Sequence, residues 1–526
     1  MSEYIYDRIP YDTRAYPSAH PRNLAAIGML YGLEAPPVER CRVLVLGCAQ
    51  GGNLFPAATR YPDSRFVGID NSQRQIEAAR ATAEKLGLAN VSLHCMDIMD
   101  MGEDMGPFDY IIAHGIYSWI PAAVRGKVFQ ICKTQLSANG IAYLSYNTLP
   151  GWHVNGIVRD IMRYRFWEHE DPMKGLEEAL RYLESIAGAV PVNNNPYMAL
   201  LKNIQAQVSA NNHTYLLHEY LSDINEAFYF HQIVGKGATL GLQYLADATF
   251  IGREFITHSA KLSNRFRAIS KNIIDYEQHF DFVSNRLFRS SLFCHQDIAL
   301  RETVSSEPLW TLYCASMAKA VELPAGQYPA GVLGFHNGGG VMVDAHPLFQ
   351  DAMKHLIEIY PRAITLAQLM ESLIPGLRMR RASPEQGREV GALYEKLLRA
   401  RAAGLVNLTM DKPAVATPGP RPPPGYRPCA LPFARLQAES GDVVVSAWNE
   451  NVGLNPFSRQ LLSLLDGTRR VQELKKELLS RIERGTLEIP GEDLETSHGA
   501  VLEKNVERRM EDSLAFFSKS GLLNIS

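Results

Sequence analysis

The chain has 526 residues, of which 46% are hydrophobic and 21% charged, a balance typical of a folded protein with about two to four domains. Its formal net charge of −3 argues against a general attraction to nucleic acid or to an anionic membrane surface, so neither is expected as a partner. Seven scattered cysteines, and no apolar run of about 18 residues, argue against a disulfide framework, a metal site and a membrane span.

The N-terminal segment combines no targeting pattern with a high density of tyrosine. Met1 to Asp7 lacks both the basic region and the apolar core of a secretory signal, so a cytoplasmic protein is expected. Residues 1–30 contain four tyrosines and three prolines, which fits a surface-wrapping arm or a lid in which Tyr6 or Tyr11 closes over a ligand. A helix is predicted from Asn23 to Tyr31.

An apolar run that enters a glycine-rich turn is the first ligand-binding pattern in the chain. Val43 to Leu46 predicts a buried strand, and the turn from Gly47 to Asn53 leads into a helical segment. The glycines allow a ligand to approach the backbone, and N–H groups at the helix start would face its polar part. An ordinary strand–turn–helix is the alternative. Cys48 is expected to be a packed small residue rather than a nucleophile.

Strands and helices alternate between residues 41 and 170. The predicted strands are 43–46, 65–70, 91–95, 108–113 and 140–146, and the predicted helices are 52–61, 72–87, 121–137 and 153–168. Such a β-α repeat is typical of a parallel, doubly wound sheet, so the fold class is predicted to be α/β.

Carboxylates follow the second and third strands, at the edge where such sheets bind ligands. Asp70 can accept hydrogen bonds from both hydroxyls of a ribose, and Asp97 with Ile98 suits the edge and face of an adenine. Asn71 and the serine after it are expected to cap a helix. Gln75, one turn later, either reaches the ligand or lies on a solvated helix face.

An aromatic cluster follows the fourth strand. His114 stands where the active-site groups of open α/β sheets gather, with a structural histidine as the alternative. Tyr117 and Trp119 come three and five residues later, and they would either form the wall of a narrow channel or pack into the core.

Several of these segments match the motifs of one enzyme family. The chain resembles the class I S-adenosylmethionine-dependent methyltransferases at Val43 to Cys48, Val67 to Asp70, Asp97-Ile98 and Phe108 to Ile112, whereas the strict G-x-G-x-x-G of dehydrogenases is absent. Longer segments are similar to bacterial methyltransferases with a methyltransferase regulatory domain: Tyr6 to Tyr11, His114 to Pro121 and Ser145 to His153. The rickettsial protein-lysine methyltransferases that modify outer-membrane proteins belong to that group. The similarity covers most of the chain.

The resemblance implies a Rossmann-like sheet of seven strands. Residues 241–245 and 291–295 would supply the sixth and seventh strands, with helices at 259–272 and 276–285 between them. Residues 170–240 would then be a helical insertion that opens the regulatory region, within a methyltransferase domain that spans 31–300.

S-adenosylmethionine is the cofactor that the resemblance implies. The residues expected to bind it are Tyr11, Gly47, Cys48, Ala49, Gly51, Asn53, Asp70, Asn71, Gln75, Asp97, Ile98 and His114. Two positions depart from the family pattern. An acidic residue that helps anchor the methionine end usually stands where this chain has Val45, and a glycine is common where it has Ala49. Weakened or altered cofactor binding would be the consequence.

The resemblance also implies N-methylation of lysine side chains in a protein or peptide. A lysine amine must first lose a proton because its pKa is near 10.4, and an apolar, aromatic channel favours the neutral form. The expected catalytic residues are Tyr117, Trp119, Tyr146 and, as the nearest candidate base, His114. The residues expected to contact the substrate are Trp152, Tyr220 and Tyr229.

Two other functions fit the same residues. A small-molecule N- or O-methyltransferase of a biosynthetic pathway would use the same cofactor site, and a non-catalytic binding protein that senses the cofactor gains some support from Val45. The large accessory region and the C-terminal module favour a macromolecular substrate, because a small acceptor needs neither.

Three segments are predicted after residue 300. Residues 301–410 are interpreted as a mainly helical, winged-helix-like domain with helices at 347–359, 365–373 and 384–403 and a strand at 406–410. A proline-rich linker at 411–432 precedes a docking or dimerisation domain at 433–526, with helices at 470–483 and 493–519. Arg378, Arg380 and Arg381 form one basic spot, interpreted as a solvated turn. Related enzymes suggest a homodimer.

Overall fold

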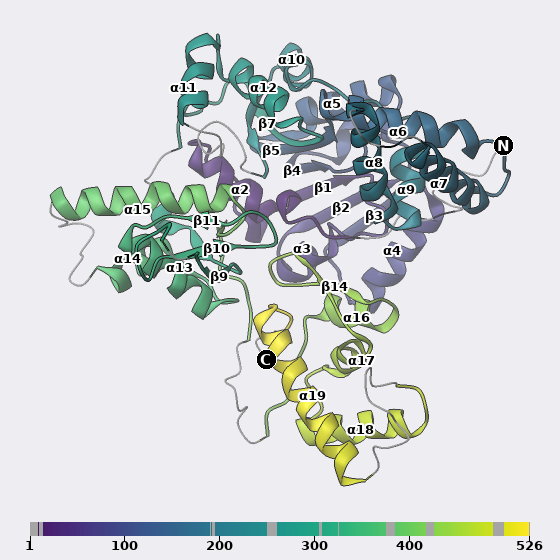
Figure 1. Ribbon diagram of the computed structural model, residues 1–526, viewed down its shortest axis with the longest axis vertical. Coiled ribbons are helices and arrows are strands. Elements are labelled where there is room, and N and C mark those ends of the chain that lie inside the picture. The colour runs from purple at the N-terminus through teal and green to yellow at the C-terminus, as the bar shows by residue number, and fades with distance from the viewer. Residues whose placement is uncertain are drawn as a thin grey trace.

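Seven strands form the central sheet of the protein, in the order β3-β2-β1-β4-β5-β7-β6 (Figure 1). The structure is a computed structural model that describes residues 9, 14–189, 191, 195–249, 260–304, 308–324, 326–374, 384–416, 425–487 and 499–524. The strands are β1 (Arg42–Leu46), β2 (Arg65–Asp70), β3 (Val91–Cys95), β4 (Phe108–Ala113), β5 (Leu136–Asn147), β6 (Leu242–Asp247) and β7 (Phe288–His295). The first five run parallel, and β7 is antiparallel to both of its neighbours. The predicted seven-stranded, Rossmann-like α/β sheet is confirmed.

Both faces of the sheet are buried, which explains why its strands are apolar runs rather than alternating ones. One face packs against α2 (Pro21–Leu30), α3 (Phe55–Arg60) and α4 (Gln73–Lys85), and the other against α5 (Ala122–Gln135) and α10 (Phe230–Thr239). Leu44 and Val45 are neighbours in β1 and both are buried, on opposite faces. Burial of one such side chain stabilises the fold by roughly 1.5–3 kcal/mol.

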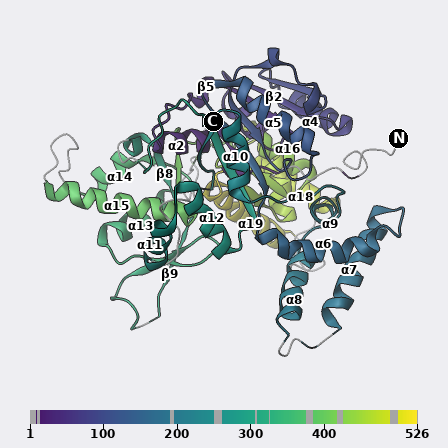
Figure 2. The ribbon, with the colours of Figure 1, turned by 90° about the horizontal axis from the view of Figure 1, so that it is seen from above.

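The predicted insertion is a set of helices with a hydrophobic core of its own. It consists of α6 (Gly151–Phe166), α7 (Pro172–Gly188), α8 (Pro196–Ser209) and α9 (His213–Tyr220). Figure 2 shows α7 and α8 projecting from the body of the molecule. The helix predicted to begin at Asp171-Pro172 is confirmed, because the Asp171 side chain caps α7 at the backbone N–H of Met173.

The helical spacing seen in the sequence from residue 213 to residue 231 is interrupted in the structure. Helix α9 ends at Tyr220 and α10 begins at Phe230. Polar residues between them bond to the end of the sheet instead of continuing the helix: the side chain of Asn225 accepts a hydrogen bond from Asn147, and the N–H of Glu226 bonds to the carbonyl of Ser118. The break therefore ties the insertion to the C-terminal end of β5.

The region after β7 contains both helices and short strands. One three-stranded sheet consists of β9 (Lys319–Glu322), β10 (Leu333–His336) and β11 (Met342–Val343). Another consists of β12 (Ile364–Thr365), β8 (Tyr313–Ala315) and β13 (Asn407–Thr409). Helices α13 (Pro347–Ile359), α14 (Leu366–Leu373) and α15 (Pro384–Ala402) also follow β7. Helices α11 (Ala260–Ile269) and α12 (Ile273–Ser284) precede it, between β6 and β7. The predicted helices and the strand at 406–410 are confirmed. The basic spot at Arg378, Arg380 and Arg381 lies outside the described residues.

Helix α2 joins the sheet to this middle region. Its apolar residues belong to a hydrophobic core that continues from one face of the sheet into α13, α14 and α15. The side chain of Asn23 donates to the carbonyl of Ala248 at 3.0 Å and accepts a hydrogen bond from Arg401 of α15. Residues 21–30 are therefore part of the core, and the expected N-terminal arm ends before them.

The C-terminal elements surround a separate hydrophobic core and lie beneath α3 in Figure 1. They are α16 (Pro432–Ser440), β14 (Val443–Val445), β15 (Asn451–Gly453), α17 (Pro456–Leu464), α18 (Val471–Glu483) and α19 (Ala500–Lys519). The rings of Phe55 in α3 and Phe433 in α16 lie 5.7 Å apart, and Asp411 forms an ion pair with Arg60 of α3. Within the described residues, every helix is too short or too polar to cross a membrane.

Candidate active site

The turn after β1 is shaped by close backbone packing. Gly47, Ala49 and Gly51 have positive φ angles of 66°, 45° and 86°. A Cβ atom on Gly47 would lie 2.5 Å from Cγ2 of Ile116, and one on Gly51 would lie 2.3 Å from the ring of Phe55. The two glycines are therefore required both by conformation and by space.

Asp70, at the end of β2, holds this turn in place. Its Oδ2 accepts a hydrogen bond from the backbone N–H of Ala49 at 2.9 Å, and its Oδ1 accepts one from Ser72 at 2.9 Å. Each carboxylate oxygen can accept more than one hydrogen bond, so these two bonds do not by themselves exclude a ribose. Ser72 caps α4, as predicted, and Asn71 beside it is exposed.

The other expected ligand contacts lie around the ends of β2 and β3. Gln75 is buried, which rules out the solvated helix face, and its Oε1 has no hydrogen-bond partner among the described residues. The Asp97 side chain caps a short 3-10 helix, Ile98–Asp100, through the N–H of Met99 at 2.8 Å. Cys48 is buried, and burial raises the pKa of its thiol, which confirms the packed residue expected there.

His114 sits at the end of β4 as a neutral ring. Its Nδ1 lies 2.8 Å from the hydroxyl of Tyr143 and 3.3 Å from that of Ser145. Burial lowers the pKa of His114 to about 3, because the surroundings disfavour the cation. A ring with so low a pKa does not take a proton from an ammonium group, so the expected role of His114 as the base does not fit this environment.

Tyr16 is a site residue that the sequence reasoning did not single out. Its ring lies against that of His114, with the ring centroids 3.7 Å apart and the planes tilted by 39°, and its backbone N–H donates to Oδ1 of Asn53 at 2.9 Å. The ring of Phe288, at the start of β7, lies 6.2 Å from His114 on an edge. The only signal for Tyr16 in the sequence was its place in the tyrosine-rich arm. Tyr11 lies outside the described residues.

Two of the expected catalytic tyrosines lie on the opposite face of the sheet from His114. Tyr117 and Tyr146 are 1% and 0% exposed and belong to the core beneath α5 and α10. The hydroxyl of Tyr146 lies 2.9 Å from that of Ser291. Side chains alternate along a strand, so Tyr143 faces His114 and Tyr146 faces away. As a correction, these two rings form packing contacts rather than the wall of a channel beside His114.

The remaining predicted aromatic residues form two separate groups. Trp152 in α6 and Tyr220 in α9 are buried against each other, with ring centroids 5.9 Å apart. Tyr229 immediately precedes α10, and its ring stacks on that of His231 with the ring centroids 5.6 Å apart. Trp119 is partly exposed, and its indole N–H is buried without an acceptor among the described residues.

Comparisons with known proteins agree along the whole chain. Three sequence-family models match: a methyltransferase domain at residues 37–185, a predicted methyltransferase regulatory domain at 212–295, and a PKMT C-terminal winged helix domain at 427–522. Uncharacterized protein RP028 of Rickettsia prowazekii (strain Madrid E) is 36% identical over 231 residues, covering 92% of that protein and 44% of this chain. The chain belongs to the class I S-adenosylmethionine-dependent methyltransferases with a methyltransferase regulatory domain.

Two longer similarities extend this methyltransferase assignment to almost all residues. Uncharacterized protein RP789 of the same Rickettsia strain is 28% identical over 537 residues, covering 98% of this chain and 93% of that protein. The structure of PKMT2 from Rickettsia typhi in complex with AdoHcy matches with a TM-score of 0.84 at 27% identity, covering 98% of this chain and 100% of that one.

The residues of the turn fit S-adenosylmethionine as the cofactor of this methyltransferase. Gly47 and Gly51 give the turn its positive φ angles, Asp70 holds it through the N–H groups of Ala49 and Ser72, and the Oε1 of Gln75, buried in α4, has no hydrogen-bond partner among the described residues. The two departures from the family pattern leave the turn intact, because Val45 packs in the core and the N–H of Ala49 is bonded to Asp70.

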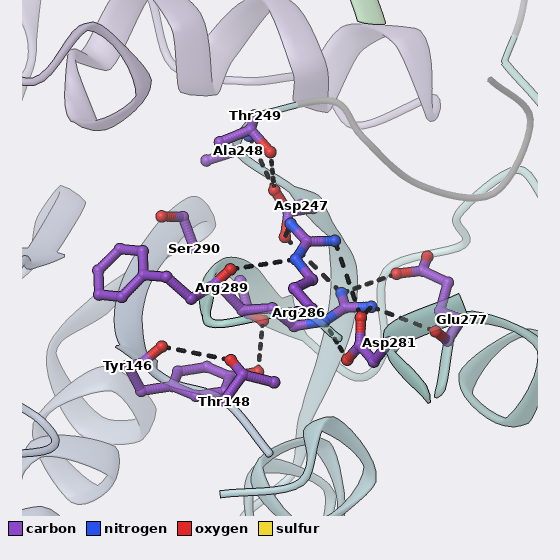
Figure 3. Close-up of polar contacts among 12 residues, drawn as sticks. Tyr146, Thr148, Asp247, Ala248, Thr249, Glu277, Asp281, Arg286, Arg289 and Ser290 are labelled. Carbon is purple, nitrogen blue, oxygen red and sulfur yellow. Dashed lines mark hydrogen bonds and ion pairs between the residues drawn. The ribbon is translucent and has the colours of Figure 1, made fainter. Parts of the chain in front are cut away.

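A buried ion cluster anchors the regulatory domain to the sheet (Figure 3). Arg289 in β7 bonds to Glu277 of α12 at 2.9 Å and to Asp281 at 2.8 Å, and Arg286 bonds to Asp247 at the end of β6 at 2.7 Å. The Arg289 guanidinium also lies 3.8 Å from the ring centroid of Phe230. The carboxylates hold the pKa of Arg289 well above its usual value. No sequence motif predicts this cluster, because its members are scattered along the chain.

Proposed function

We propose that this methyltransferase N-methylates lysine side chains of a protein substrate. The observation that carries the proposal is the full-length similarity to PKMT2 of Rickettsia typhi, including the regulatory domain and the C-terminal winged helix domain. A similarity confined to the cofactor domain would not distinguish between classes of methyl acceptor.

The surroundings of His114 suit an amine acceptor. When bound, S-adenosylmethionine supplies an electrophilic methyl group. The neutral His114 ring, with the Tyr16 ring against it and Phe288 at its edge, provides an uncharged aromatic wall at the end of β4. Such a wall binds a cationic amine by its ring faces and favours the neutral amine by excluding water.

The helical insertion supports a macromolecular substrate over a metabolite. Helices α6 to α9 have their own core and include a pair that projects away from the sheet (Figure 2). A small acceptor held at His114 needs no such extension. The alternative, a small-molecule N- or O-methyltransferase, uses the same cofactor site and is distinguished by its acceptor.

Methyl transfer from labelled S-adenosylmethionine tests the proposal. A bacterial protein extract is compared with the same extract after its lysines have been acetylated. We expect label in the native proteins and little in the acetylated ones, with mass spectrometry placing the methyl groups on lysine Nζ. Label in the low-mass fraction of both extracts would instead support a small-molecule acceptor. No transfer at all would favour a non-catalytic binding protein.

A further inference from the structure

Glu219, in the last turn of α9, is a carboxylate that the sequence reasoning did not identify. It is partly buried at the junction between the helical insertion and the sheet. Its Oε1 lies 3.5 Å from Nδ2 of Asn147, the last residue of β5, and its backbone carbonyl accepts a hydrogen bond from Asn225 at 2.6 Å. Among the described residues, no lysine or arginine forms an ion pair with this carboxylate.

Glu219 faces the same side of the sheet as the His114 site. Asn147 follows Tyr143 and Ser145 at alternate positions of β5, so all three side chains point to one face, and the first two contact His114. Tyr215, one turn before Glu219 in α9, is affected by charge on both Glu219 and Tyr16, the residue whose ring lies against His114. Burial is the largest cause of the raised pKa of Tyr215, and the charges of Glu219, Tyr220 and Tyr16 raise this pKa further.

We propose that Glu219 binds the ammonium group of the substrate lysine and takes its proton before methyl transfer. This inference rests on the proposed lysine function. In the proton transfer, an N–H bond of the ammonium breaks and its electron pair stays on nitrogen, while the proton forms an O–H bond with the carboxylate. Water later removes that proton, which returns Glu219 to its charged form and balances the cycle.

The environment of Glu219 matches this task. Burial raises its pKa to about 7, opposed by the hydrogen bond from Asn147 and by the charge of Arg159. A carboxylate with a pKa near the working pH is a far better proton acceptor than an ordinary glutamate. His114, whose pKa is lowered to about 3, cannot compete for the proton.

The charged and titratable groups around Glu219 come from two helices. Arg159 of α6 donates to the backbone carbonyls of Tyr220 and Ser222 rather than to the carboxylate, and its pKa is lowered to about 10 by burial. Tyr215 and Tyr220 of α9 keep neutral hydroxyls there, because burial raises the pKa of both. An incoming ammonium group would therefore be the close cationic partner that this carboxylate lacks.

The pH dependence of methyl transfer by Glu219→Gln tests the proposal. With the native extract as acceptor, we expect the variant to be at least about 100-fold slower than the parent near pH 7. The deficit should shrink towards about pH 9.5, because the fraction of neutral lysine in solution rises tenfold per pH unit. Glu219→Asp, which keeps a carboxylate, should retain more activity. Glu177→Gln, at an exposed carboxylate on α7, is the matched control and should behave as the parent.

Two measurements do not depend on turnover. Infrared difference spectra of parent minus Glu219→Gln, both saturated with S-adenosylhomocysteine, should show one carboxyl group that titrates near neutral pH. Butylamine, as a mimic of the lysine side chain, should bind the parent at least about tenfold more tightly than the variant. Thermal unfolding and S-adenosylhomocysteine affinity of each variant establish that the fold is kept, and Glu219→Ala, which also lacks the carboxylate, replaces Glu219→Gln if the latter does not fold.

The outcomes separate this inference from the lysine function itself. A Glu219→Gln deficit that is constant across pH, or no deficit, overturns the proton-transfer role while leaving lysine methylation in place. A parent enzyme that binds butylamine through Glu219 but methylates no lysine overturns the lysine function and leaves an amine site. Equal butylamine affinity in parent and variant overturns the amine site.

Discussion

His114 illustrates how burial decides the charge state of a single side chain. Its Nδ1 lies beside the hydroxyls of Tyr143 and Ser145, and its ring is covered by Tyr16. Protonation would bury a cation that forms no ion pair with a carboxylate of the described residues. The pKa of His114 is lowered to about 3 because burying the cation costs free energy. His114 is therefore neutral at neutral pH.

This neutrality predicts a pH-dependent stability. The folded pKa lies below the ordinary value of 6.5, so on acidification the unfolded state binds a proton that the folded state does not, and the free energy of unfolding falls. At pH 5.5 the loss from this one group is about 1.4 kcal/mol. Urea unfolding at pH 7 and 5.5 should show a smaller loss for His114→Gln than for the parent. His213→Gln, at the exposed start of α9, is the control. Equal losses in all three proteins would contradict the prediction.

Asp70 is expected to couple cofactor binding to the shape of the turn. Asp70→Ala removes the acceptor of the Ala49 and Ser72 N–H groups as well as the expected ribose contact. We predict at least a tenfold loss of S-adenosylmethionine affinity by calorimetry and a stability loss of about 1–3 kcal/mol. Asp63→Ala, an exposed carboxylate near the other end of β2, should change neither. Unchanged affinity in Asp70→Ala would remove Asp70 from the cofactor site.

The position of each residue along the chain explains which of the predicted residues the structure brings together. Gly47, Gly51 and Asp70 were identifiable because the turn chemistry is local in sequence. Tyr146 was misplaced because a sequence motif does not reveal which face of β5 a side chain takes. Tyr16 comes from a distant part of the chain, and proximity of that kind is not encoded in any local pattern.

The same limit appears at the scale of whole elements. Strands and helices of the sheet were predictable because apolar runs and helical periodicity are local signals. The break between α9 and α10 was not, because it depends on the hydrogen bond between Asn147 and Asn225, which are far apart in the chain. The ion cluster around Arg289 could not be predicted from the sequence for the same reason, since its members lie in three separate elements.

That ion cluster is expected to fix α12 to the sheet. Removing one partner of a buried ion group leaves the others uncompensated, at a cost of about 3–5 kcal/mol. We therefore predict such a loss of unfolding free energy for Arg289→Met, which keeps much of the side-chain volume but removes the guanidinium that pairs with Glu277 and, most closely, with Asp281. Chemical denaturation measures it.

An exposed ion pair provides the contrast. Arg181 pairs with Glu178 one turn earlier on α7, and Arg181→Met should cost less than about 1 kcal/mol. A similar small loss for Arg289→Met would mean that the buried cluster contributes no more than a surface pair. Methyl transfer in a still-folded Arg289→Met would then show whether the position of α12 matters for activity.

At the scale of the whole molecule, the C-terminal domain packs against residues that lie next to the candidate active site. Phe433 of α16 packs on Phe55, and Phe55 in turn packs beneath Gly51 of the cofactor turn. Asn451 of β15 bonds to both polar groups of the Ala15 backbone, accepting from its N–H at 3.3 Å and donating to its carbonyl at 2.8 Å. The domain thus contacts both the turn and the arm. A homodimer stays a prediction, for which light scattering is the test.

Asn451 therefore connects the winged helix domain to the tyrosine that covers His114. Ala15 is followed directly by Tyr16, whose position depends on the backbone at this point and on Asn53. Asn451→Ala removes two hydrogen bonds worth about 1 kcal/mol each, enough to shift the arm towards an open state by roughly tenfold or more. We expect faster hydrogen exchange at residues 14–16 and a methyl-transfer rate lowered by up to about tenfold, with the C-terminal core intact. Glu439→Ala, exposed on α16, should change neither quantity. If exchange at the arm rises while the rate stays constant, Tyr16 can leave His114 without consequence, and the aromatic wall proposed for the amine must rest on Phe288 and the helices of the insertion alone.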